Sequence, residues 1–231
     1  MGAALLERLV ALLVPPLCAV CREPELSGDV VCPACRRRLV ALPDPRCARC
    51  GAPVVTSMPR CPECRGRALA FQTAWSPFAY ESSARGLVAA LKSRGATAAA
   101  RSMAREIASR APPGLLRGTL VPVPAHPARQ RREGMNQAAS LAAALGRAAG
   151  LPVGSCLRRS PGSRPQVGLA RAQRLANARG SVSAAPPLPA GRLVLVDDVY
   201  TTGATLDACA RALAGLGAAE VVAVTFARAT R

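Results

Sequence analysis

The chain has 231 residues, with 31 basic against 13 acidic side chains, a formal net charge of +18 and an isoelectric point near 11.2. The length can bury a core and suits one medium domain plus a small one, while no segment is apolar for long enough to cross a membrane. The charge favours a polyanionic partner such as nucleic acid, or a phosphorylated substrate. Because Lys92 is the only lysine in a chain rich in Ala, Gly and Pro, part of this arginine reflects compositional bias.

Residues 1–16 are predicted to form an amphipathic helix. Packing on the protein itself is the favoured role of this helix, and docking to a membrane surface or a partner is the alternative. The segment has no basic leader region and no small-residue cleavage site, so we expect a cytoplasmic chain that reaches the inner face of the membrane only through partners. The leucines at helical spacing are Leu5, Leu6, Leu9, Leu12 and Leu13.

Eight of the ten cysteines form four C-x-x-C pairs separated by ten, eleven and ten residues, so the segment 17–69 is close to a twofold repeat. Each pair can turn two thiolates toward one point, and two pairs complete the tetrahedron that zinc prefers. We predict a double zinc ribbon with two structural zinc ions, since sulfur fills all four positions of each site and leaves none open for catalysis. The predicted ligands are Cys18, Cys21, Cys32, Cys35, Cys47, Cys50, Cys61 and Cys64.

The pairing of these cysteines stays open at this point. Neighbouring pairs could share a zinc ion and give two side-by-side ribbons, or alternate pairs could share one and give a cross-braced module; the sequential repeat favours the first. A disulfide framework is the competing interpretation, but it requires an oxidising compartment. Cys156 and Cys209 lie outside the repeat, and we expect both to be small buried hydrophobic side chains.

Residues 70–231 alternate short β-rich runs with Ala/Leu-rich helical stretches. This alternation predicts an α/β fold with an open, mostly parallel sheet covered on both faces. The segment also holds most of the positive charge, because it has 21 basic residues from position 71 onward against 7 acidic ones. The predicted strands are 73–80, 119–123, 193–196 and 221–226, and the predicted helices are 83–93, 97–110, 136–149, 168–178 and 203–216.

The segment LVLVDDVYTTGAT, residues 193–205, joins a predicted central strand to a predicted helix. Ligands bind beyond the carboxyl ends of the strands in such sheets. The loop 201–205 falls at a helix N-terminus, where backbone N–H groups and the helix dipole favour a phosphate. Asp197 and Asp198 can accept hydrogen bonds from sugar hydroxyls or help to place a metal ion. Helix capping alone would explain the loop, but not its combination with a buried strand and a double Asp.

VLVDDVYTTGATL resembles the phosphoribosyl-pyrophosphate (PRPP) signature of type I phosphoribosyltransferases. The resemblance implies that Asp197 and Asp198 contact the ribose hydroxyls. In a catalytic member, pyrophosphate leaves C1 of the ribose through an oxocarbenium-like state, and Mg²⁺ with basic side chains neutralises it. The resemblance assigns the 5′-phosphate to Thr201, Thr202, Gly203, Ala204 and Thr205, and the pyrophosphate to Lys92, Arg129, Arg131 and Arg132.

Nearly the whole chain resembles the ComF competence family, in which a cysteine-rich zinc module precedes this fold. The matching stretches are YESSARGLVAALKSRG, VPVPAHPARQRREGMNQA and RPQVGLARAQRLANARGSV, together with the cysteine module. Ser82, Glu133 and Met135 depart from the family pattern, and Glu133 should weaken pyrophosphate binding unless it points away or helps to position magnesium. His126, the only histidine, is a candidate proton carrier, and a solvent-exposed or packed side chain is its more ordinary role.

Three functions remain in view. The first is a phosphoribosyltransferase-fold protein that binds PRPP or a related sugar phosphate with Mg²⁺, with a role in competence and DNA uptake implied by the resemblance. The second is a non-catalytic module that binds single-stranded DNA or proteins of the uptake machinery. Six arginines without an acid in residues 158–179 favour it, and the lack of Phe, Trp and Tyr in residues 81–199 opposes it. The third is a regulator that senses PRPP without turning it over.

Overall fold

The computed structural model describes residues 17–25, 29–92, 96–125, 134–159 and 181–230. The predicted helices 1–16 and 168–178, His126 and the basic loop Arg129, Arg131 and Arg132 lie outside the described residues. The described strands are β1 (Ala74–Trp75), β2 (Phe78–Ala79), β3 (Thr119–Pro122), β4 (Leu157–Arg159), β5 (Val182–Ala184), β6 (Leu193–Tyr200) and β7 (Val221–Arg228). The described helices are α2 (Pro33–Arg37), α3 (Ser82–Leu91), α4 (Ala96–Arg110), α6 (Gln137–Ala149) and α8 (Ala204–Ala214).

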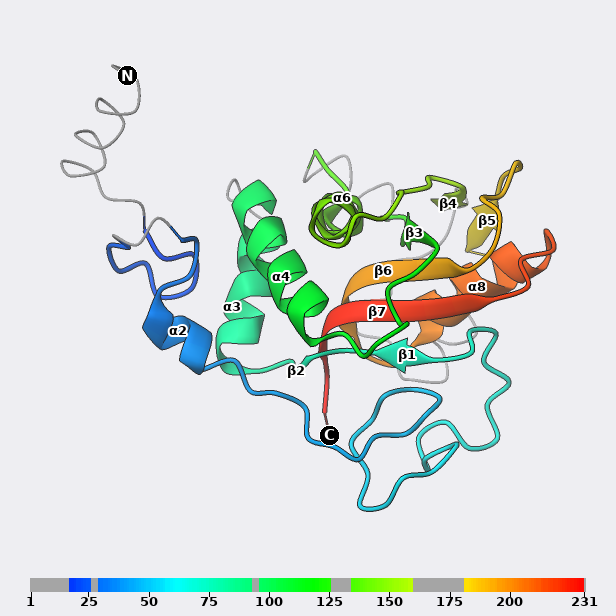
Figure 1. Ribbon diagram of the computed structural model, residues 1–231, viewed down its shortest axis with the longest axis horizontal. Helices are drawn as coiled ribbons and strands as arrows, with labels where there is room; N and C mark the ends of the chain where they lie inside the picture. The colour runs from blue at the N-terminus through cyan, green and yellow to red at the C-terminus, as the bar shows by residue number, and fades with distance from the viewer. Residues whose placement is uncertain (1–16, 26–28, 93–95, 126–133, 160–180, 231) are drawn as a thin grey trace.

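A five-stranded parallel sheet forms the centre of the molecule (Figure 1). Its strand order is β1, β7, β6, β3, and β2 also pairs with β7. The two middle strands, β6 and β7, are almost continuous apolar runs, as expected of strands buried on both faces. The predicted open, mostly parallel sheet is therefore confirmed.

Helices cover both faces of this sheet. On β6, Leu193 and Leu195 pack in one core with α8, while Val194 and Val196 pack in a second core with α3, α4 and α6. The alternation follows from the period of two along a strand. Figure 1 shows the same arrangement, with α3, α4 and α6 on one side of the sheet and α8 on the other.

Three details differ from the sequence-based prediction. The predicted strand 73–80 is two short strands, β1 and β2, separated by Ser76 and Pro77, because proline has no N–H to donate to the ladder. Strand β6 does not end at Val196 but continues through the two aspartates to Tyr200, still paired with β7. A small antiparallel pair, β4 and β5, was not predicted, since its three-residue strands are too short to show a period.

Within the residues described, no helix combines the length and the apolar character that crossing a bilayer requires.

Candidate functional site

The eight cysteines of the repeat gather in two groups of four, each with its four sulfur atoms within 4.8 Å of one another. Neighbouring pairs combine in each group, so the structure brings together the sequential pairing that the repeat favours. The first four-cysteine site is Cys18, Cys21, Cys32 and Cys35, and the second four-cysteine site is Cys47, Cys50, Cys61 and Cys64.

The spacing of the sulfur atoms fits tetrahedral zinc. At a Zn–S distance of about 2.3 Å, two sulfurs of a tetrahedron lie about 3.8 Å apart. The Cys21 and Cys32 sulfurs are 3.8 Å apart, and Cys61 and Cys64 are 3.9 Å apart. Two further pairs in the second site are slightly closer, at 3.6 Å for Cys47 with Cys64 and 3.5 Å for Cys50 with Cys61. The two four-cysteine sites therefore fit the zinc sites of a double zinc ribbon.

In each site, backbone N–H groups that point at a sulfur atom lower the pKa of one cysteine thiol. Burial by itself would raise the pKa of the Cys18 thiol, but N–H groups, including that of Cys32 at 3.4 Å, lower it to about 6. Cys47 shows the same balance: burial opposes ionisation, yet N–H donors such as that of Cys61 (3.2 Å) lower its pKa to about 7. Since zinc binds thiolates, each site has a ligand that is ready near neutral pH.

The first four-cysteine site is attached to the face of the sheet covered by α3 and α4. Val20, between Cys18 and Cys21, lies so close to Gly86 of α3 that a Cβ there would meet Val20 Cγ1 at 2.8 Å. Arg36 of α2 pairs with Asp29 (2.7 Å) and lies 3.7 Å from Glu106 of α4. Buried members of this site belong to the α3–α4–α6 core.

The second four-cysteine site is attached to the opposite face. All four of its cysteines belong to the core that contains α8. Asp207 of α8 accepts a hydrogen bond from the Ala70 N–H (2.7 Å), and Arg211 of α8 donates to the Ala68 carbonyl oxygen. The segment that follows Cys64 is thus fixed directly to the helix that begins at the loop 201–205.

The two aspartates of β6 point to opposite faces of the sheet, because successive residues of a strand alternate. Asp198 lies on the side of α3, and its Oδ2 is 3.4 Å from the ammonium of Lys92, the C-cap residue of that helix. Asp197 lies on the side of α8 and interacts electrostatically with Arg159 and Cys209. The structure therefore brings Asp198 and Lys92 together but does not place the two carboxylates side by side.

The loop after β6 has the features of an anion-binding helix start. Gly203 adopts the left-handed conformation (φ 73°) and is the N-cap residue of α8. The Ala204 N–H donates to Thr202 Oγ1 at 3.3 Å, which leaves the next N–H groups of the first turn directed outward from the helix end. Thr201 is exposed and Thr205 is half-buried, so their hydroxyls are available to a ligand.

Two arginines near these residues were not identified as site residues from the sequence. Arg159 falls in the basic run that was ascribed to DNA binding or to a solvated face. Burial nevertheless lowers the pKa of its guanidinium, and the nearby Cys209 and Asp197 offset only part of this effect. Arg228, at the end of β7, is only 1% exposed and contacts Cys50, Glu63 and Tyr200. Neither has a local sequence signal, because their partners are distant along the chain.

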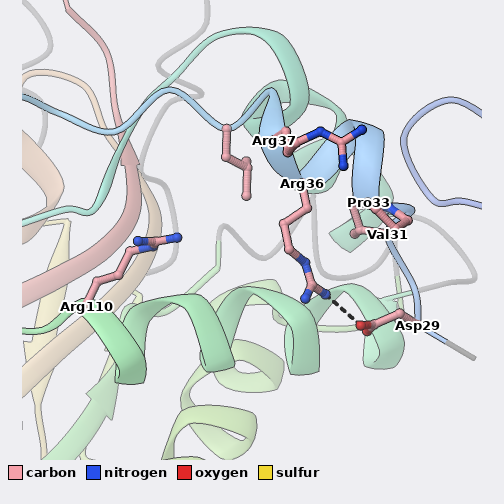
Figure 2. Close-up of a pocket in the computed structure, with 7 residues that line it drawn as sticks. Asp29, Val31, Pro33, Arg36, Arg37 and Arg110 are labelled. Atoms are coloured by element: carbon pink, nitrogen blue, oxygen red, sulfur yellow. Dashed lines mark hydrogen bonds and ion pairs between the residues drawn. The ribbon is translucent and has the colours of Figure 1, made fainter. Parts of the chain in front are cut away.

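A separate cavity of about 480 Å³ lies between α2 and the end of α4 (Figure 2). Arg36, Arg37 and Arg110 line it, and among the described residues of its lining Asp29 is the only acidic one. Figure 2 shows Arg36 bonded to Asp29. None of the lining residues that the structure describes belongs to β6 or to the loop 201–205, so this basic pocket is distinct from the site at Asp197 and Asp198.

Comparison with known proteins agrees with this two-part organisation. The model of the double zinc ribbon domain matches residues 9–65, and the model of the phosphoribosyl transferase domain matches residues 132–231. Competence protein F of Haemophilus influenzae is 37% identical over 114 residues, which are 48% of this chain and 50% of that protein. The chain is similar to the ComF family through this relative and through the order of its two matched domains. The match to this curated ComF relative spans half of the relative's length.

Two solved structures show a weaker likeness to this chain. Glutamine PRPP amidotransferase from B. subtilis, complexed with ADP and GMP, is 22% identical, and the match covers 55% of this chain and 26% of that chain with a TM-score of 0.38. The allosteric regulatory enzyme of purine biosynthesis is 20% identical, with coverage of 54% and 25% and a TM-score of 0.35. At these scores the fold assignment rests on the sheet topology and the family model.

Proposed function

We infer that this protein binds PRPP, or a related sugar phosphate, together with Mg²⁺ at the carboxyl end of β6. The observation that carries the proposal is that β6 holds the Asp198–Lys92 pair two residues before its end and then leads into the Gly203-capped start of α8. A carboxylate that can accept hydrogen bonds from sugar hydroxyls thus lies on the same strand that leads into a helix N-terminus, where a phosphate can bind. The phosphoribosyl transferase domain model supports it by matching residues 132–231, which contain Asp198 and Gly203 but not Lys92.

Different residues of the chain would bind different groups of the ligand. The first turn of α8, with the hydroxyls of Thr201 and Thr205, donates hydrogen bonds to the 5′-phosphate, and Asp198 accepts hydrogen bonds from the ribose hydroxyls. Lys92 adds a positive charge on the same side as Asp198, where an anionic leaving group would be neutralised. Thr202 and Gly203 are largely buried and shape the turn, and Ala204 opens the helix.

Magnesium fits the donor set at this edge of the sheet. Asp197 and Asp198 are both half-buried but face opposite sides of the sheet, so either one can supply a hard oxygen ligand, and Mg²⁺ prefers one or two such carboxylates together with substrate phosphates. When bound, Mg²⁺ supplies charge neutralisation to the pyrophosphate group. The residues of this chain contribute the carboxylates and hold them at the end of a rigid, paired strand.

Calorimetric titration of PRPP with Mg²⁺ into the zinc-loaded protein tests the proposal. Asp198→Asn keeps the size of the side chain but removes its charge, so it should weaken binding about ten- to hundredfold, the range for hydrogen bonds to charged groups. Asp44→Asn is the matched control, because Asp44 is 81% exposed and lies outside the site. Saturable binding that is unchanged in Asp198→Asn, or no binding in the wild type, would contradict the proposal. Release of pyrophosphate in a nucleobase screen then separates a transferase from a PRPP sensor.

The basic pocket supports a second candidate function, binding of single-stranded DNA in the uptake process to which the relative's name, Competence protein F, refers. Arg37 takes part in none of the ion pairs between described residues, so its charge is available to a phosphate. Charge reversal in Arg37→Glu should weaken binding of a fluorescent oligothymidine and flatten its salt dependence, whereas Asp198→Asn should leave both unchanged. An unchanged salt dependence in Arg37→Glu would exclude the pocket as the DNA site.

A further inference from the structure

Arg228 is a fully buried arginine that lies against the second four-cysteine site. Its Nη1 donates to the Cys50 carbonyl oxygen (2.6 Å), and its Nη2 lies 3.8 Å from the Cys50 sulfur and 2.9 Å from Glu63 Oε2. A buried guanidinium is costly unless its charge and its N–H groups are matched. The Cys47–Cys64 segment supplies that match, although it is more than 160 residues away along the chain.

The same guanidinium also lies against the residue that supports the loop 201–205. Its carbon Cζ is 4.3 Å from the centre of the Tyr200 ring, and Tyr200 and Arg228 are paired across β6 and β7. The ring in turn packs on Gly203, where an added Cβ would meet Tyr200 Cζ at 2.7 Å. A continuous series of contacts therefore runs from the Cys50 sulfur through Arg228 and Tyr200 to Gly203.

We propose that Arg228 is a positioning residue, through which the second four-cysteine site holds the loop 201–205 in its binding conformation. The role of the loop as a ligand site rests on the proposed function, whereas the coupling itself does not. Four thiolates around one Zn²⁺ carry a net charge of −2, which attracts the buried guanidinium. Arg228 then keeps the Tyr200 ring against Gly203 and so maintains the left-handed turn at the start of α8. Without the charge of the zinc–thiolate site, Glu63 is the anionic partner that Arg228 keeps in this series of contacts.

The coupling should be specific to the second site. The buried cysteines of the first site belong to the core of the other face, and its contacts lead to α3 and α4 rather than to α8. The two zinc ions should therefore differ in their response to a ligand at the loop. Because linkage is reciprocal, a ligand that orders the loop must also strengthen retention of the second zinc ion.

Hydrogen exchange of the full-length, zinc-loaded protein measures the coupling without any ligand. Arg228→Met removes the charge and the hydrogen bonds but keeps the length of the side chain. Arg110→Met is the matched control, since Arg110 also lies over an aromatic ring, Phe78 at 5.1 Å, and also pairs with an acid, Glu106 at 3.1 Å. Exchange in residues 201–205 should accelerate about fivefold or more in Arg228→Met, with zinc content retained, and not in Arg110→Met. Equal exchange in the two variants would overturn the proposal, whether or not PRPP binds.

A second measurement uses the wild-type protein and a zinc-selective chelator. Saturating PRPP with Mg²⁺ should slow the release of one of the two zinc ions about fivefold or more and leave the other unchanged. Release of both ions at unchanged rates, in a protein that does bind PRPP, would overturn the coupling; absence of PRPP binding would instead contradict the proposed function. If Arg228→Met does not fold, Glu63→Gln weakens the same link from its more exposed end. Faster exchange in residues 201–205 then supports the proposal, and wild-type exchange overturns it.

Discussion

Gly203 is the position at which a single added methyl group should most disturb the start of α8. Its φ of 73° lies in the left-handed region, where an L-alanine costs about 1–2 kcal/mol. The new Cβ would also lie 2.7 Å from Tyr200 Cζ and 3.1 Å from Cε2, and the ring cannot retreat because Arg228 packs on it. Overpacking of this kind adds about 1–3 kcal/mol. Gly203→Ala should therefore lower the free energy of unfolding by about 2–5 kcal/mol.

Gly217→Ala separates the two contributions. Gly217 has a φ of 89°, but an added Cβ would meet nothing within 4 Å, so only the backbone cost of about 1–2 kcal/mol applies. Urea unfolding of both variants under zinc-saturated conditions, with the slope compared to that of the wild type, gives the two values. The reasoning is refuted if Gly203→Ala is no more destabilising than Gly217→Ala, within about 0.5 kcal/mol.

Metal analysis should find two zinc ions per chain, and one in Cys64→Ser. Because Cys64 is fully buried and Cys21 is exposed, Cys64→Ser should lower the free energy of unfolding more than Cys21→Ser does. Equal losses of stability would contradict this difference. Iodoacetamide at pH 8 should leave Cys156 and Cys209 unmodified until the protein is unfolded, because burial raises the pKa of both thiols and few thiolates form at that pH. Mass spectrometry of the alkylated protein checks this, and labelling of either residue in the native state would show that the core opens. Lys92→Met should weaken PRPP binding about tenfold and reduce its salt dependence, measured by titration at two ionic strengths; an unchanged affinity would remove Lys92 from the site.

Features with a local pattern could be predicted from the sequence. The spacing of the four C-x-x-C pairs led to both four-cysteine sites, and the apolar run at Leu193–Val196 led to a central strand. Both patterns are local because the residues that define them are close along the chain. The link between Arg228 and Cys50 has no such pattern, since 178 positions separate the two residues.

The orientation of the two aspartates shows a different limit. Ending the predicted strand at Val196 placed Asp197 and Asp198 beyond the strand, where the period of two does not apply. Once β6 is seen to continue to Tyr200, the period of two sends one carboxylate toward Arg159 and the other toward Lys92. The strand continues because β7 pairs with it as far as Arg228, and strand length set by a partner is not encoded in the strand itself.

The place of β7 in the sheet has a consequence for how the chain is made. It is the most C-terminal of the described strands, yet it lies between β1 and β6, so Ala74 pairs with Ala223. At about 5–20 residues per second, roughly seven to thirty seconds pass on the ribosome between the synthesis of β1 and that of its partner. During that interval β1 has an open edge and β6 has only β3 beside it. The sheet is therefore completed only after β7 leaves the exit tunnel, and nascent chains that stop before Val221 should be targets for chaperones or proteases rather than partly folded proteins.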